Sequence, residues 1–256
     1  GSTTSITEKA DKNGVYRILN TDIEINRSEV GDAPGLFYGY EVLGIVQNQA
    51  QADEYNNRTG RSAKVGDLMF GDEKTTIGDP NPDFTCGMNN TLTYGPWSLG
   101  IQLSASYGND VFNLIRMRLE GMTDKWTNYH SDCLNFAKIA KDANGNEYVT
   151  NPETNIPRPD NKDTNGNCKT VSDRYVEDGS YLKIQNVSLS YSLPEAVNKK
   201  LHINGLRVSA NVQNVYTFTN YSGYDPEIPG SAIRQGVDEG RYPTPRQYTL
   251  GLNFNF

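Results

Sequence analysis

Two carboxylates in the sequence, Asp225 and Glu227, are close enough together to suggest acid–base chemistry. A glycosidase needs two carboxyl groups that face one bond, about 5–10 Å apart. Pro226 lies between the two residues and restricts the backbone there, and no facing geometry can be assigned to such a pair from its spacing. We therefore interpret residues 225–227 as a structural turn within a long loop.

Metal chemistry has weak support in the sequence. Residues 142–146 and 163–167 resemble fragments of Ca²⁺ loops, but calcium needs about six to eight oxygen ligands, and neither fragment has the full loop with a terminal glutamate at the required spacing. Asn-Gly turns explain both segments without a metal. His130 lies near Cys133, but two further zinc ligands at suitable spacing are missing from the sequence. We expect no metal site.

Other catalytic and cofactor chemistry has no motif to carry it. The sequence lacks a Gly-x-Ser-x-Gly nucleophile elbow, a P-loop and a dinucleotide fingerprint. Its 256 residues carry a net charge of −7, and the basic residues are scattered along the chain, which argues against nucleic-acid binding. We expect a protein that is not an enzyme, holds no cofactor and binds no nucleic acid.

The sequence contains three cysteines, of which Cys133 and Cys168 flank a polar segment. If the chain is exported to an oxidising exterior, a disulfide between Cys133 and Cys168 is the favoured arrangement. Three free thiols are the alternative.

The elements that position these residues are predicted to be β-strands. Only 36% of the residues are hydrophobic, while Tyr (16) and Gly (24) are plentiful, which suits an all-β protein with one watery face. No stretch approaches the roughly 20 apolar residues of a membrane-spanning helix, but a barrel strand needs only about 9–11 residues with alternate positions polar. The clearest alternation lies at the end of the sequence, where one face carries Tyr248, Leu250, Leu252, Phe254 and Phe256.

Residues 97–107 repeat this alternation with an aromatic residue at each end, as in a strand that crosses a bilayer. A Gly95-Pro96 turn joins this strand to an alternating segment at residues 84–94. Further candidate strands are residues 187–193 and 206–212, and weaker ones are residues 15–25 and 36–46. We predict about seven strands in total.

The connections between the strands alternate in length. The gaps before residue 205 and at residues 95–96 are short, whereas those near residues 47–83, 108–180 and 218–246 are long. Within the longest gap, residues 110–126 are expected to form either a short helix or an irregular loop. Outer-membrane barrels have tight periplasmic turns and long extracellular loops. Because unpaired strand edges are costly in lipid, the sequence predicts one portion of a larger closed antiparallel barrel, whose missing strands precede it.

Several segments in order resemble one family, the TonB-dependent outer-membrane transporters of the SusC/RagA type. The segments are residues 35–40 (Gly-Leu-Phe-Tyr-Gly-Tyr), 44–45, 77–84, 106–110, 173–182, 187–194, 213–214, 225–227 and 243–256. They cover nearly the whole chain, so all of residues 1–256 are expected to belong to the C-terminal part of the transporter barrel. One departure is the short loop at residues 66–78, to which no ion or ligand role is assigned.

The resemblance implies a barrel of about 22 strands in the outer membrane of a Gram-negative bacterium, in contact with its lipids. It implies active import of glycans or peptides together with a SusD-like surface lipoprotein, driven by the TonB complex. The plug domain, the segment that contacts TonB and the earlier strands are not in this sequence. A surface receptor or adhesin barrel without transport is the alternative, and a soluble carbohydrate-binding β-sandwich is a third candidate.

Two sets of residues are candidate functional sites under this interpretation. Outer-loop tyrosines Tyr129, Tyr221 and Tyr224 are candidates for stacking on sugar rings, although packing against neighbours or a lid protein also accounts for them. The apolar face of residues 248–256 matches a C-terminal assembly signal as well as an ordinary lipid-facing strand. We predict that deletion of Phe256 lowers the yield of folded barrel.

Overall fold

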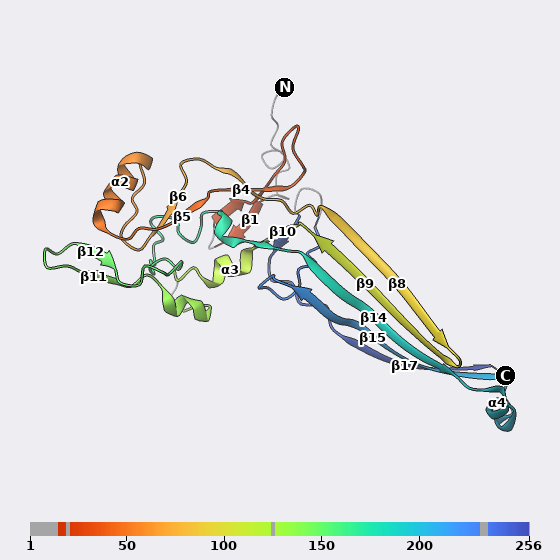
Figure 1. Cartoon of the computed structure of the whole chain (residues 1–256). Helices are drawn as coiled ribbons and strands as arrows, with labels where there is room; N and C mark the ends of the chain where they lie inside the picture. The colour runs from red at the N-terminus through yellow and green to blue at the C-terminus, as the bar shows by residue number, and fades with distance from the viewer. Residues whose placement is uncertain (1–14, 19–20, 124–125, 231–234, 256) are drawn as a thin grey trace. The chain divides into compact units, whose positions relative to one another are not determined.

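The computed structural model describes residues 15–18, 21–123, 126–230 and 235–255 and divides the chain into two compact units (Figure 1). The first, here called the loop unit, comprises residues 1–81, 110–177 and 228–240. The second, here called the sheet unit, comprises residues 82–109, 178–227 and 241–256. Each unit therefore joins segments that are far apart in the sequence.

The sheet unit is one five-stranded antiparallel sheet with the strand order β17-β15-β14-β9-β8. The strands are β8 (Phe84–Tyr94), β9 (Trp97–Tyr107), β14 (Tyr181–Ser192), β15 (Gly205–Thr219) and β17 (Gln247–Asn255). Every strand pairs with its neighbour in sequence order, as in an up-and-down barrel wall. Among the described residues these five strands form an open sheet, and no barrel closure is seen.

The register aligns the alternating residues into rows across the sheet. Leu92, Leu99, Leu189, Ala210 and Leu250 form one row of directly paired positions. The adjacent row consists of Thr93, Ser98, Ser190, Ser209 and Gly251. Because neighbouring residues of a strand point to opposite faces, one face of the sheet is apolar and the other is polar. The predicted alternation of residues 84–107 and 248–255 is confirmed.

A bulge interrupts β14 between Ile184 and Asn186. On the N-terminal side of the bulge, Lys183 pairs with Ser104 of β9 and Ile184 pairs with Leu103. The extra residue is Gln185. After it the odd-numbered residues of β14 lie on the apolar face, whereas before it the even-numbered residues do, so Lys183 lies on the polar face.

The connections of the sheet alternate as predicted. Gly95, with φ +54°, and Pro96 close the short turn between β8 and β9, and residues 193–204 join β14 to β15 through helix α4 (Glu195–Leu201). Helix α4 begins after Pro194 and ends at His202, whose left-handed backbone stops the helix. The connections from β9 to β14 and from β15 to β17 are long.

The prediction of seven barrel strands is wrong, because two of the seven lie in small sheets of the loop unit. Within residues 15–25, β1 (Val15–Ile18) pairs antiparallel with β2 (Thr21–Glu24). Residues 36–46 form β4 (Leu36–Gly39), which pairs with β3 (Asn26–Arg27) and β7 (Thr75–Gly78), and β5 (Val42–Ile45), which pairs with β6 (Leu68–Phe70). Alternation in these strands reflects contact with a protein core: Phe37 is fully buried and Ile45 almost so.

The remaining elements of the loop unit are short. They are α2 (Gln49–Thr59), β10 (Asp110–Asn113), α3 (Leu114–Leu119), η1 (Ser131–Asn135), β11 (Ile139–Lys141), β12 (Glu147–Val149), η2 (Asp173–Tyr175), β13 (Val176–Asp178) and β16 (Val237–Asp238). Residues 110–126 thus begin as a strand and continue as a short helix, which Asn113 caps by accepting a hydrogen bond from the backbone of Arg116. Among the described residues, no helix is long and apolar enough to cross a membrane.

Two hydrophobic clusters stabilise the loop unit. The first is composed of Ile25, Phe37, Phe112, Leu114, Met117, Val171, Tyr175 and Val237. The second is composed of Ile45, Val46, Ala52, Tyr55, Ala63, Val65, Leu68, Phe70, Ala137 and Val149. Because each cluster draws on segments distant in sequence, the long connections form a packed body rather than separate loops.

Candidate ligand-binding site

A pocket of about 800 Å³ opens in the loop unit. Its described wall includes the apolar residues Met122, Leu134, Phe136 and Pro159, the rings of Tyr129 and His130, and the polar residues Asp160 and Asn161. A volume of this size is typical of a small-molecule site. The pocket lies within one unit, so its walls are positioned by the contacts of that unit alone.

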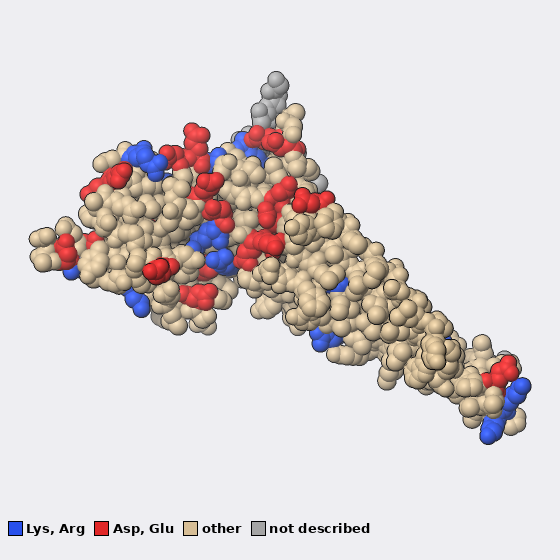
Figure 2. All heavy atoms as spheres, in the orientation of Figure 1, with Lys and Arg blue, Asp and Glu red and all other residues tan. Residues whose placement is uncertain are grey.

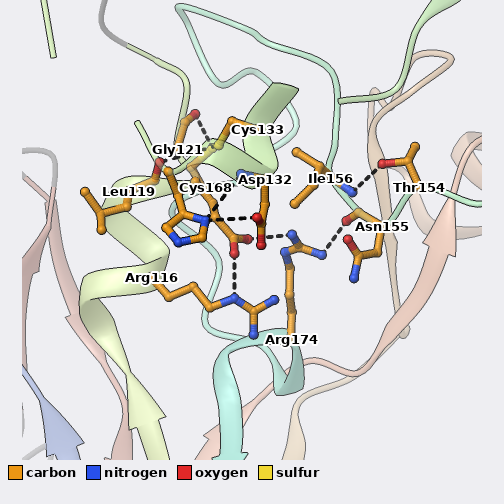
Figure 3. A network of polar contacts seen from close by, with 12 residues as sticks. Arg116, Leu119, Gly121, Asp132, Cys133, Thr154, Asn155, Ile156, Cys168 and Arg174 are labelled. Carbon is orange, nitrogen blue, oxygen red and sulfur yellow. Dashed lines mark hydrogen bonds and ion pairs between the residues drawn. The ribbon is translucent and has the colours of Figure 1, made fainter. Parts of the chain in front are cut away.

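The end of helix α3 positions one wall of the pocket through its carbonyl groups. The Leu119 carbonyl accepts a hydrogen bond from the backbone of His130 (3.1 Å) and one from the Cys133 thiol (3.5 Å). The Gly121 carbonyl accepts a hydrogen bond from the Cys168 thiol (2.7 Å), as Figure 3 shows. Carbonyls at a helix C-terminus have no partner within the helix, and here side chains and loop backbone supply it.

A buried ion cluster lies at the end of helix α3 (Figure 3). Glu120, with 3% of its side chain exposed, bonds Arg116 and Arg174, each at 2.5 Å. Arg174, with 5% exposed, also donates a hydrogen bond to the Asn155 carbonyl. Burial alone would lower the pKa of Arg116, but Glu120 and Glu177 raise it above its ordinary value. The cluster therefore joins α3 to the segments that contain η2 and Asn155.

Asp160 provides a fixed negative charge at the pocket. Its carboxylate accepts hydrogen bonds from the backbones of Lys162 and Thr164, both at 3.0 Å, and from the Thr164 hydroxyl at 2.8 Å. The hydrogen bond from the Thr164 backbone is the largest of the effects that lower the pKa of Asp160 to about 2. The group is therefore ionised at any physiological pH.

The three predicted tyrosines belong to two different units. Tyr129 is half-buried and lines the pocket of the loop unit. Tyr224 belongs to the sheet unit and is 77% exposed, whereas Tyr221 of the same unit is only 6% exposed and offers no open ring face. A role of these tyrosines in substrate binding stays a prediction.

The predicted disulfide between Cys133 and Cys168 is not formed in the structure, where both residues are buried free thiols. Each thiol is instead engaged with a different backbone carbonyl, as described above. Burial raises the pKa of both thiols, which disfavours the reactive thiolate.

The polar face of the sheet unit contains a charged cluster that sequence reasoning missed. The Lys183 ammonium, with 6% exposed, bonds the Glu227 carboxylate at 2.7 Å and lies 4.0 Å from that of Asp225. The backbone of Glu227 also donates to the Asp225 side chain (3.1 Å), so the expected turn at residues 225–227 is confirmed. A signal was present in the sequence, because Lys183 is the one charged residue of residues 181–192.

The candidate metal segments are turns in the structure. The Asp142 side chain accepts hydrogen bonds from the backbones of Asn144 and Asn146, and the Asp163 side chain accepts one from the backbone of Cys168. Within the described part of the chain, no three His, Cys, Asp or Glu residues are grouped as metal ligands.

The terminal strand has the apolar face that the assembly signal requires. Tyr248, Leu250, Leu252 and Phe254 are between 47% and 85% exposed in the sheet unit, while Phe256 lies outside the described residues. Figure 2 shows that charged side chains are dense over the loop unit and sparse on the visible face of the five-stranded sheet. The recognition of this strand during assembly stays a prediction.

Comparison with known proteins places these features in a family. No family model matches the sequence. A TonB-dependent receptor P3 of Formosa agariphila is 33% identical over 88% of this chain, and the TonB-dependent receptor SusC of Bacteroides thetaiotaomicron is 24% identical over 97% of it. The chain spans 22% of the length of each. The chain belongs to the SusC/RagA-type TonB-dependent receptors.

A solved structure of the RagAB peptide transporter supports the fold. The alignment covers 95% of this chain and 25% of that chain, with a TM-score of 0.65 and 23% identity. TonB-dependent receptors are outer-membrane proteins of Gram-negative bacteria, and they are transporters rather than enzymes. The predicted family and location are therefore confirmed for this SusC/RagA-type chain.

Proposed function

We propose that this chain is part of an outer-membrane importer that takes up oligosaccharides or oligopeptides, using energy delivered by the TonB complex. The observation that carries the proposal is the two-faced sheet of a SusC/RagA-type receptor, in which apolar and polar rows run across five paired strands. In a barrel wall the apolar rows face lipid and the polar rows face the lumen.

The partner of the importer is a SusD-like surface lipoprotein. Support comes from the likeness of the fold to the RagAB peptide transporter and of the sequence to the receptor SusC. The long connections of the loop unit are the candidates for contact with this lipoprotein, because two hydrophobic clusters pack them together.

The test is uptake by cells that carry or lack the gene of the complete receptor. We expect labelled oligosaccharides or oligopeptides to accumulate only with the receptor and with an intact TonB complex, and a lipoprotein to co-purify with the receptor in detergent. Surface binding that persists without TonB-dependent accumulation would instead support a receptor or adhesin barrel without transport.

A further inference from the structure

The pocket of the loop unit is lined mainly by apolar atoms. Leu134 is 80% exposed at its edge, and Phe136, Met122 and Pro159 contribute further carbon surface. Burial of an apolar side chain in such a pocket is favourable in proportion to the apolar area removed from water. An apolar group of several carbons is therefore the first requirement for its ligand.

The pocket wall also carries polar side chains, and those of His130 and Asp160 are already engaged in hydrogen bonds. The Nδ1 atom of His130 accepts a hydrogen bond from the backbone of Asp132, and one oxygen of Asp160 accepts both hydrogen bonds from Thr164. A buried sugar brings several hydroxyl groups, each of which costs free energy when it lacks a partner. Because the larger share of the pocket surface is apolar, the pocket favours a ligand that combines an apolar group with one polar group over a ligand with hydroxyls on every side.

Asp160 determines which charge the polar group of the ligand should have. Its carboxylate stays ionised, and its second oxygen accepts one backbone hydrogen bond from Lys162, which leaves a further lone pair on that oxygen. An ammonium group forms a charge-assisted hydrogen bond with a carboxylate of this kind. A carboxylate or sulfate of a ligand would be repelled by it.

Hydrogen bonds and an ion pair hold the segments that line the pocket. The carbonyls of Leu119 and Gly121 fix the segments around Cys133 and Cys168, and the Glu120–Arg174 pair holds the helix end from behind. Pre-organised walls reduce the conformational entropy that binding costs.

We propose that the pocket binds the amino-terminal residue of an oligopeptide, with a bulky apolar side chain against Leu134 and Phe136 and the ammonium group at Asp160. This rests on the proposed function, because it assigns the substrate class of that importer. The pocket then acts as an outer capture site for peptides.

The test measures binding of defined probes to the complete receptor in detergent by calorimetry. The probes are a tetrapeptide with an amino-terminal leucine, the same peptide acetylated at its amino terminus, and a neutral tetrasaccharide. We expect acetylation to weaken binding by about tenfold, since it removes the charge. Equal affinity for both peptides, or tighter binding of the tetrasaccharide, overturns the proposal.

Two variants and a matched control locate the site. Leu134→Asn is expected to weaken binding of both peptides by about fivefold, whereas Val30→Asn, at a position 79% exposed in the same unit, is expected to leave binding unchanged. Asp160→Asn is expected to weaken only the peptide with a free amino group. A merely structural role of Asp160 would weaken both peptides equally.

Uptake by cells separates this proposal from the proposed function. If TonB-dependent uptake occurs but the Leu134 and Asp160 variants bind and transport peptides normally, the pocket assignment fails alone. If no uptake depends on TonB, the proposed function fails as well.

Discussion

Loss of Glu227 and loss of Lys183 from their ion pair should affect stability differently, because the Lys183 side chain is buried and the Glu227 side chain is 47% exposed. We expect Glu227→Gln to destabilise the segment at residues 220–227 by about 2 kcal/mol, since it removes the nearer of the two negative charges beside a buried ammonium. Lys183→Met should cost less, because both carboxylates can become hydrated. Hydrogen exchange of residues 220–227 measures the difference, and the reverse order would contradict this account.

Arg174 is the residue whose loss should disturb the pocket wall most. Replacement by Met leaves Glu120, which is almost fully buried, with Arg116 alone, and breaking a buried pair in this way costs about 3–5 kcal/mol. Arg58, which bonds Asp72 at 2.8 Å on the surface, provides the control, because exposed pairs contribute about 0–1 kcal/mol. Chemical unfolding of Arg174→Met and Arg58→Met receptors checks the contrast, and similar unfolding of both variants would refute it.

Acid should loosen the Asp160 turn. A carboxyl group whose pKa is lowered on folding stabilises the folded chain above its ordinary pKa of 3.8, and this contribution is lost as the pH falls toward 2. We expect the Asp160→Asn receptor to lose less thermal stability than the unaltered protein when the pH falls from about 5 to about 2. Identical acid profiles for the two proteins would show that the turn does not depend on the charge.

At the scale of the elements, the two faces of β17 should respond differently to charge. Leu250→Arg places a cation in the apolar row and should cost about 2–4 kcal/mol in a membrane, whereas Thr249→Arg adds it to the polar row at little cost. The yield of folded barrel on a gel that separates folded from unfolded receptor is the measurement. Equal yields of the two variants would contradict the assignment of the faces.

The five long strands could be predicted from the sequence because a strand of nine or more residues leaves a clear period of two. The short strands β4 and β5 have the same alternation over four residues each, and the sequence does not indicate whether lipid or a protein core covers the apolar side. Here Phe37 and Ile45 contact the two clusters of the loop unit. For this reason the prediction of a barrel strand at residues 36–46 is wrong.

At the scale of the whole molecule, the long connections were predicted but their packing was not. Val237, Phe37 and Phe112 belong to one cluster, although about 200 residues separate Phe37 from Val237 along the chain. Pairings this distant leave no local period in the sequence. The pocket followed the same rule: Tyr129 was a candidate from its residue type, while Asp160 and Arg174 acquire their roles only when their segments meet.

The single additional residue in β14 has a consequence for how this wall tolerates deletions. Gln185 sets the face on which each residue before it in β14 lies. Without it, the ammonium of Lys183 would turn to the apolar face, and Leu182 and Ile184 would turn to the polar face. Removal of Gln185 should therefore abolish folding of the receptor, although it shortens the chain by one polar residue only. Removal of Asn144 from the exposed turn between β11 and β12 should be tolerated, and mass-spectrometric quantification of both variants in outer membranes would compare them.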